Sequence, residues 1–243
     1  MSTKFDPTIL YEDDKLLVLN KPAGLSIHGS DKQSNGTVAD WIIQHYPELR
    51  QISDNFISST GQSFPRAGLV HRLDRNTTGV LLVAKTKETY LELKKMFAAR
   101  LIEKIYQAIV YGKMKQEAGV IDVPIGRSRK DPRRRVANPR AFGRLRQART
   151  AYRVLECFPH FTYVELKPQT GRTHQLRAHL KSIGFPIVAD ALYAPAGERL
   201  PTIARQALHA SSLHFLWQGK PVAFTAPAPE DMLKTLDYLR QTC

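Results

Sequence analysis

The sequence predicts an α+β fold, with a central, mostly antiparallel sheet and a few helices packed on it. Pairs of β-rich runs separated by short turns outnumber strand–helix–strand units, which indicates hairpins rather than parallel crossovers. Only a few stretches carry apolar residues at helical spacing. The 243 residues, 42% of them hydrophobic and 24% charged, suffice for one domain with a full core or for two closely packed lobes.

The predicted strands are runs rich in apolar and β-branched residues, separated by turn-forming residues. They lie at 9–11, 16–19, 79–85, 105–111, 120–125, 150–157, 161–167, 208–217 and 222–225. The segment Lys21-Pro22-Ala23-Gly24 is expected to end the second strand. The run 79–85 is apolar on both faces, which predicts a buried central strand.

The predicted helices begin at residues that can cap a helix. They are expected at 38–46, 86–99, 173–183 and from Pro229 onward. Thr37, Thr86 and Thr173 are the expected N-caps of the first three. The polar residues 50–67 are expected to form a mobile loop.

A net charge of +14 and a pI near 9.9 indicate a polyanionic partner. The charge is concentrated in a predicted basic insertion at 127–149. Its cationic residues are Arg127, Arg129, Lys130, Arg133, Arg134, Arg135, Arg140, Arg144, Arg146 and Arg149. Asp131 is the only acid there, so the segment carries +9 of the +14. Arginine suits bidentate phosphate contact, which favours nucleic acid over a generally basic, soluble protein.

Other function classes are disfavoured. No run of 18 apolar residues is present, and no amphipathic helix accompanies the basic segment, so we expect no membrane partner. The N-terminus lacks the apolar core of a signal peptide, which predicts a cytoplasmic protein. Cys157 and Cys243 form no disulfide framework, and no metal-ligand spacing occurs, so neither metal nor cofactor is expected.

The most informative motif is His71-Arg72-Leu73-Asp74, directly before the predicted central strand. It places one carboxylate between the guanidiniums of Arg72 and Arg75, on a loop whose charged side chains are costly to order. Active sites are commonly mounted at the end of such a rigid strand. For the motif in isolation, a turn in which Asp74 pairs with Arg72 or Arg75 would be the favoured interpretation, because four residues are weak evidence.

Three further segments accompany this loop in a fixed order. They are Glu103-Lys104-Ile105-Tyr106, the run Thr170-Gly171-Arg172-Thr173-His174-Gln175-Leu176-Arg177-Ala178-His179-Leu180, and Leu208-His209-Ala210-Ser211. With these motifs the chain resembles the RluA family of pseudouridine synthases over nearly its whole length. The resemblance implies two subdomains with a cleft between them, and the conversion of uridine in RNA to its C-glycoside isomer without cofactor or metal.

The resemblance also implies a role for individual residues. Asp74 matches the catalytic aspartate, Tyr106 the tyrosine that packs on the target base, and Arg177 the arginine that pairs with the catalytic aspartate. Arg72 matches a residue that holds the RNA distorted around the flipped base. Arg172 could bind phosphate or merely brace its loop, while Arg133, Arg134 and Arg135 are expected to contact RNA phosphates.

The chemistry agrees with those roles. A uridine in structured RNA must leave the base stack before it can be rotated, and an aromatic ring then recovers about 1–3 kcal/mol of stacking energy. Whether Asp74 attacks a carbon or removes the C2′ proton stays open, since both need an ionised carboxylate. Tyr106 could instead be strand core, and His71, His174 and His209 are expected to be structural hydrogen-bond partners.

The remaining predictions concern the RNA substrate, the oligomeric state, a further RNA-binding domain and the competing functions. Large-subunit ribosomal RNA is the first expected substrate and tRNA the second, with the protein acting as a monomer. Many relatives carry an N-terminal S4-type RNA-binding domain, which is expected to be absent because few residues precede the first strand. A non-catalytic RNA-binding or ribosome-assembly factor and a metal-dependent phosphodiesterase are the competing functions, and the single carboxylate of the loop disfavours the second. We expect residues 127–149 to be poorly ordered without RNA.

Overall fold

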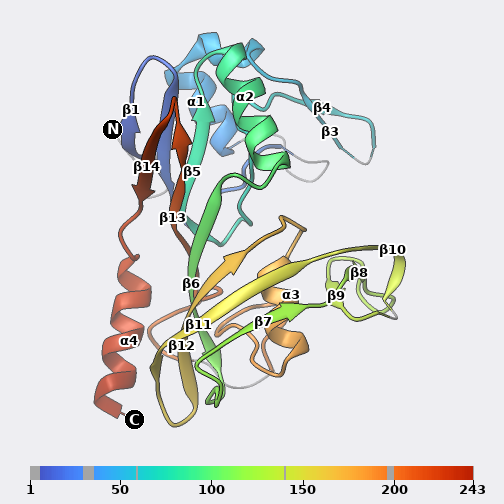
Figure 1. The fold of residues 1–243 in the computed structure, drawn as a ribbon, viewed down its shortest axis with the longest axis vertical. Coiled ribbons are helices and arrows are strands. Elements are labelled where there is room, and N and C mark those ends of the chain that lie inside the picture. The colour runs from blue at the N-terminus through green and yellow to red at the C-terminus, as the bar shows by residue number, and fades with distance from the viewer. Residues whose placement is uncertain (1–5, 30–35, 59, 140, 196–199, 243) are drawn as a thin grey trace. The chain divides into compact units, whose positions relative to one another are not determined.

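The chain forms two compact units in the computed structural model, which describes residues 6–29, 36–58, 60–139, 141–195 and 200–242 (Figure 1). Unit 1 comprises Met1–Ile102 and Ser212–Pro227, and unit 2 comprises Glu103–Ser211 and Ala228–Cys243. The structure confirms the predicted α+β class, with a large, mostly antiparallel sheet and few helices.

Unit 1 is built on strands in the order β1-β2-β5-β13, with β14 paired to β13. The strands are β1 (Thr8–Glu12), β2 (Leu16–Lys21), β5 (Thr78–Ala84), β13 (Leu208–Trp217) and β14 (Lys220–Thr225). The first part of β13, through Ser211, belongs to unit 2. Every residue of β5 is buried, which confirms the predicted central strand.

The two α-helices of unit 1, α1 (Val38–His45) and α2 (Lys87–Ala98), begin at the predicted caps. The 3₁₀ helix η1 (Pro47–Gln51) follows α1 and was not predicted. Thr37 and Asp40 form a reciprocal capping box, and the Thr86 hydroxyl accepts the Thr89 N–H. Tyr90 and Leu93 of α2 pack into one apolar cluster with residues of β2, β5 and β13. Local capping and apolar spacing therefore locate these helices.

Unit 2 has strands in the order β13-β6-β12-β11-β7. Its elements are β6 (Glu103–Tyr111), β7 (Ala118–Asp122), β11 (Arg149–Cys157), β12 (Phe161–Pro168), α3 (Gln175–Ser182) and α4 (Glu230–Thr242). Antiparallel registers join β12 to both β6 and β11. The core cluster combines apolar residues of these strands with Leu176 and Leu180 of α3 and with Leu236 and Leu239 of α4.

The basic segment differs from its expected lack of order. It forms a small sheet, β10-β8-β9, from β8 (Ile125–Arg127), β9 (Arg135–Ala137) and β10 (Phe142–Arg146). Ile125 and Ala137 are buried in one cluster with Ala178 of α3 and Tyr193. These few apolar contacts anchor a segment whose composition is dominated by charge. Arg140 lies outside the described residues.

Three smaller expectations are corrected. Residues 50–67, expected to be a loop, contain the short hairpin of β3 (Phe56–Ile57) and β4 (Ser63–Phe64). The strand expected at 120–125 is divided between β7 and β8. His174 rather than Thr173 is the N-cap of α3, and it adopts the left-handed conformation with φ 54° and no side-chain cap bond.

Two further expectations concern membrane-spanning helices and cysteines. Within the described residues no helix is both long and apolar enough to cross a membrane. Cys157 is an exposed free thiol, and Cys243 lies outside the described residues.

Gly68 offers a test of the chain path that leads into the His71-Arg72-Leu73-Asp74 loop. Its φ of 75° favours glycine, and an added Cβ would overlap the Ala84 carbonyl oxygen in β5. We expect Gly68→Ala to lower the free energy of unfolding by about 3 kcal/mol, from backbone strain plus overlap. Gly61→Ala is the control, because Gly61 also has positive φ (87°) but faces open space, and about 1 kcal/mol is expected there. Equal losses in urea unfolding would contradict the overlap.

Candidate active site

The loop before β5 places Asp74 in a closed turn. The Thr77 N–H donates to the Asp74 carbonyl oxygen at 3.0 Å, and Thr77 and Thr78 are buried behind it. Asp74 is half-buried, whereas Arg72 is exposed. The loop therefore presents a carboxylate at the start of the most buried strand of unit 1.

A buried lysine holds the other side of this loop. Lys21 is 0% exposed, and its Nζ donates to the carbonyl oxygens of Pro22 (2.7 Å), Leu25 (2.9 Å) and Arg75 (2.9 Å). Gly24 and Arg75 add two bonds, Gly24 N–H to Arg75 O and Arg75 Nε to Gly24 O. From sequence, Lys21-Pro22-Ala23-Gly24 predicts only the end of a strand. The signal it carries is a cation at the end of an otherwise apolar strand.

His71 and Arg72 have different surroundings. The Leu82 N–H donates to His71 Nε2 at 2.9 Å, and the His71 ring stacks on Phe97, as expected of a structural partner. Burial lowers the pKa of His28, and the positive charges of Arg72 and Arg66 lower it further. Arg72 thus adds positive potential to the exposed side of its loop.

The remaining predicted site residues belong to unit 2. Tyr106 lies in β6, half-buried and opposite Leu166 of β12. Arg177 lies in the first turn of α3 and is 5% exposed. Because Asp74 belongs to unit 1, its pairing with Arg177 stays a prediction.

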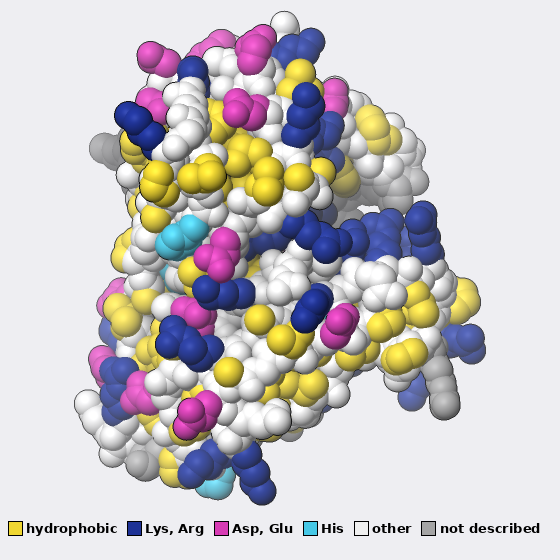
Figure 2. Space-filling view, in the orientation of Figure 1, with side chains coloured by type: hydrophobic (Ala, Val, Ile, Leu, Met, Phe, Trp, Pro, Cys, Tyr) yellow, Lys and Arg dark blue, Asp and Glu magenta, His cyan; other side chains and the backbone are white. Residues whose placement is uncertain are grey.

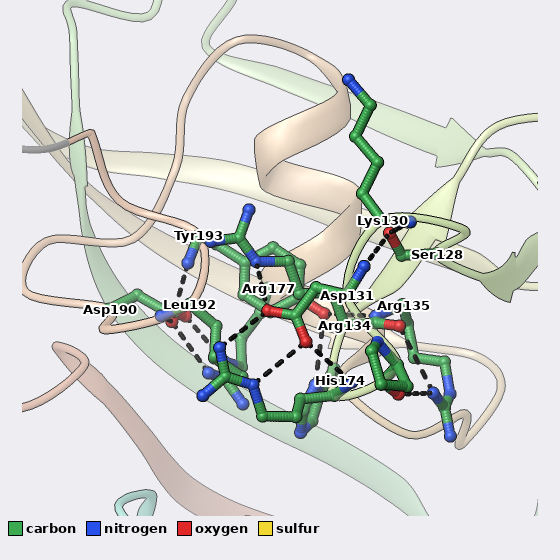
Figure 3. A network of polar contacts seen from close by, with 12 residues as sticks. Ser128, Lys130, Asp131, Arg134, Arg135, His174, Arg177, Asp190, Leu192 and Tyr193 are labelled. Atoms are coloured by element: carbon green, nitrogen blue, oxygen red, sulfur yellow. Dashed lines mark hydrogen bonds and ion pairs between the residues drawn. The ribbon is translucent and has the colours of Figure 1, made fainter.

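Arg177 forms a two-point ion pair with Asp190, which the sequence analysis did not identify (Figure 3). Its Nε donates to Asp190 Oδ2 at 2.6 Å and its Nη2 to Oδ1 at 2.8 Å. Asp190 also accepts the N–H groups of Leu192 and Tyr193. A buried guanidinium needs such compensation, because desolvating each ion costs several kcal/mol. Asp190 therefore sets the position of Arg177.

Tyr193 connects this pair to the basic segment. The Arg177 Cζ lies 5.0 Å from the centre of the Tyr193 ring. The Tyr193 hydroxyl accepts the Arg135 N–H at 2.7 Å and lies 3.1 Å from His174 Nδ1, to which it can donate (Figure 3). One side chain thus joins β9, the start of α3 and the buried arginine.

Gln175 organises the loop in which Arg172 lies. Its buried amide makes four hydrogen bonds, to Thr170 Oγ1, the Arg172 N–H, the Arg149 carbonyl oxygen and Thr150 Oγ1. The Arg172 Nε donates to the Gln147 carbonyl oxygen at 3.1 Å. The bracing alternative for Arg172 therefore has a structural basis, and a phosphate contact would use its remaining guanidinium N–H groups.

Two of the three consecutive arginines, Arg133 and Arg134, share one acid. Arg133 binds Asp131 through Nε at 3.0 Å and Nη2 at 2.9 Å, and the Arg134 Nε lies 3.5 Å from the same carboxylate. The hydrogen bond from Arg133 is the main reason that the pKa of Asp131 falls to about 2. Arg135 donates to the carbonyl oxygens of Pro132 and Arg134. Part of their charge is therefore already balanced.

Comparison with known proteins matches the chain to one family. A family model described as RNA pseudouridylate synthase matches residues 15–182. The chain is 40% identical to ribosomal large subunit pseudouridine synthase D of Nitrosomonas europaea and 39% identical to the protein of that name from Pseudomonas aeruginosa. Each match covers 96% of this chain, and 65% and 72% of the respective relatives. The solved structure of human RNA pseudouridylate synthase domain containing 4 matches with a TM-score of 0.72 and 28% identity, covering 96% of this chain and 92% of that one.

The pair of Arg177 and Asp190 can be tested by removing one charge. We expect Asp190→Asn to lower the free energy of unfolding by about 3–5 kcal/mol, because a buried guanidinium loses its counter-ion. The control is Asp237→Asn, whose partnership with Arg240 is exposed and should contribute little. Urea unfolding monitored by circular dichroism measures both. An Asp190→Asn protein as stable as the control would refute the assignment.

His179 gives the fold a pH dependence. Its side chain lies between the Thr150 hydroxyl and the Val123 carbonyl oxygen, and burial lowers its pKa below the ordinary 6.5. The unfolded chain then binds a proton more tightly than the folded one, so this contribution to stability is complete above pH 6.5 and is lost as pH falls below it.

We expect His179→Gln to flatten the decline in unfolding free energy between pH 7.5 and 5. His160→Gln, on an exposed turn, should leave the decline unchanged. Parallel urea titrations at four pH values compare the slopes, and identical slopes for His179→Gln and wild type would contradict the assignment.

Proposed function

Because this chain belongs to the RNA pseudouridylate synthase family, we propose that it converts specific uridines to pseudouridine in large-subunit ribosomal RNA. The observation that carries this proposal is the pair of anchored charged elements, the Asp74 loop held by Lys21 and the α3 arginine held by Asp190. The names of two relatives at about 40% identity support the choice of RNA.

Asp74 is the proposed catalytic residue and Arg177 its proposed cationic partner. A neighbouring guanidinium favours the ionised form of a carboxylate, which both candidate mechanisms require. Arg177 donates to Asp190 through Nε and Nη2, which fixes the plane of the guanidinium. Asp190 then acts as a positioning residue for Arg177.

Tyr106 is the proposed stacking partner of the extruded uracil. Tyr106 lies in the first half of β6 and is half-buried, packed against the core of unit 2. The isomerisation breaks the bond from N1 of the base to C1′, turns the base, and joins C5 to C1′; C5 releases its proton and N1 takes one up. No electrons are gained or lost overall, so neither nicotinamide nor redox metal is required.

RNA phosphates are the proposed partners of five arginines that are exposed or half-buried. Arg72, Arg172, Arg133, Arg134 and Arg135 carry guanidinium N–H groups that can contact phosphate oxygens. Each neutralised phosphate releases counterions, so binding should weaken steeply with salt. We further propose that the protein acts as a monomer in the cytoplasm, and tRNA remains the second candidate substrate.

The reaction is tested by release of tritium from RNA labelled at uracil C5, with ribosomal RNA and tRNA compared as substrates. We expect wild type to release tritium from ribosomal RNA and Asp74→Asn to release none. Tyr106→Leu should lower kcat/KM about 10–100-fold through lost stacking, while Tyr106→Phe retains the ring. Asp237→Asn is the charge-matched control on an exposed part of α4.

Release from tRNA alone would change the proposed substrate. No release from either RNA, together with tight and salt-sensitive binding, would favour the non-catalytic RNA-binding function. Full activity of Asp74→Asn would remove Asp74 from its proposed role.

A further inference from the structure

The small sheet β10-β8-β9 carries an exposed surface that the proposed reaction does not use. We infer that this Arg–Phe surface, formed by Arg127, Arg129, Phe142, Arg144 and Arg146, binds an unpaired segment of RNA, with one base stacked on Phe142 and phosphates on the arginines. The inference rests on the proposed RNA substrate and adds a second contact on it. All five residues are exposed.

The first argument is uncompensated charge. Arg133 and Arg134 share Asp131, and Arg149 lies 3.8 Å from Asp122. Among the described residues, by contrast, no carboxylate pairs with the three surface arginines Arg127, Arg144 and Arg146. Positive side chains gather around β8 and β10 with apolar side chains between them (Figure 2). Guanidiniums left without counter-ions on a small sheet are suited to an external polyanion.

The second argument is the exposed aromatic ring. Phe142 is 53% exposed and lies opposite Arg127 in the β10–β8 register. The Arg129 Cζ lies 5.4 Å from the centre of its ring. Exposing half a phenylalanine forgoes much of its burial energy. A base that stacks on the ring would recover that surface, and arginine beside it adds a cation–π contact.

The shape of β10 explains why this ring is not core. The register shifts between Phe142 and Arg146, so that β10 bulges over β8. Gly126 accommodates the bulge, since a Cβ there would lie 3.0 Å from Leu145 Cδ2 and 2.8 Å from Ala141 Cβ. Leu145 thus packs onto β8, whereas Phe142 projects beside the arginines.

The small sheet that carries the Arg–Phe surface is anchored by apolar contacts and a hydrogen bond. Ile125 and Ala137 pack with Ala178 and Tyr193, and the Tyr193 hydroxyl accepts the Arg135 N–H. A surface on anchored strands loses less conformational entropy on binding than a flexible tail. An unpaired strand is favoured over a duplex because only an unpaired base exposes its face for stacking.

Fluorescence tests the stacking directly, without reference to catalysis. Phe142→Trp is titrated with a 12-nucleotide single-stranded oligouridylate, with a duplex of equal length and with an oligoglutamate. We expect saturable quenching by the single strand, beyond the background of Trp41 and Trp217 in wild type. Leu216→Trp, 64% exposed on β13, is the control and should show no added quenching.

Affinity provides the second measurement. We expect Phe142→Ala to weaken single-strand binding about tenfold at fixed salt, and Phe142→Trp to retain it. The double variant Arg144→Gln with Arg146→Gln should reduce the slope of log Kd against log salt by about 1.4, from about 0.7 per phosphate on single strands. Arg153→Gln with Arg240→Gln removes the same charge from arginines paired with Glu165 and Glu156 and should leave the slope nearly unchanged.

Failure of this inference is distinguishable from failure of the proposed reaction. Normal tritium release by wild type, with no added quenching in Phe142→Trp and unchanged affinity of Phe142→Ala, would overturn the Arg–Phe surface alone. Quenching by oligoglutamate but not by RNA would also overturn it. Quenching and the expected slope change in a protein that releases no tritium would support the surface while refuting the synthase proposal.

Discussion

The ammonium of Lys21, fully enclosed by protein, fixes the loop on which the proposed chemistry depends. Removing a charge from water costs several kcal/mol unless protein groups replace its hydration. The acceptors are carbonyl oxygens from both sides of the loop region, including Arg75, 54 residues further along the chain. Any displacement of the turn that contains Asp74 would leave this cation partly unsolvated. Moving the Asp74 carboxylate would therefore cost the free energy of leaving the Lys21 ammonium without one of its carbonyl acceptors.

Unit 2 also uses a buried ion to position a charged side chain, but here the buried ion is the anion Asp190 and the positioned side chain is the cation Arg177. Asp190 receives two guanidinium N–H groups and two backbone N–H groups, so Arg177 is held in place by a neighbour that need not contact RNA. Each unit thus positions its proposed site residue by means of a buried ion with several partners. This arrangement limits the conformational freedom of each charged group before substrate arrives.

The sequence predicts those parts of the fold that are determined locally. Caps at Thr37 and Thr86 and the apolar run of β5 depend on neighbouring residues, and the structure bears them out. The left-handed cap at His174 and the partner of Arg177 depend on contacts between residues that are distant in the sequence. The sequence contains several acids that could pair with Arg177, so Asp190 could not be singled out. Order in the basic segment was also missed, because two buried residues, Ile125 and Ala137, outweigh a composition typical of disorder.

The link between the Tyr193 hydroxyl and the Arg135 backbone has an evolutionary consequence. Since the bond uses a main-chain N–H, it does not depend on the side chain at position 135, with proline as the exception. The outward-facing residues of the basic segment can therefore change through mutation while the segment keeps its attachment to α3. A protein built this way can acquire preference for a different RNA by substitutions at its surface, without the loss of stability that usually accompanies new function.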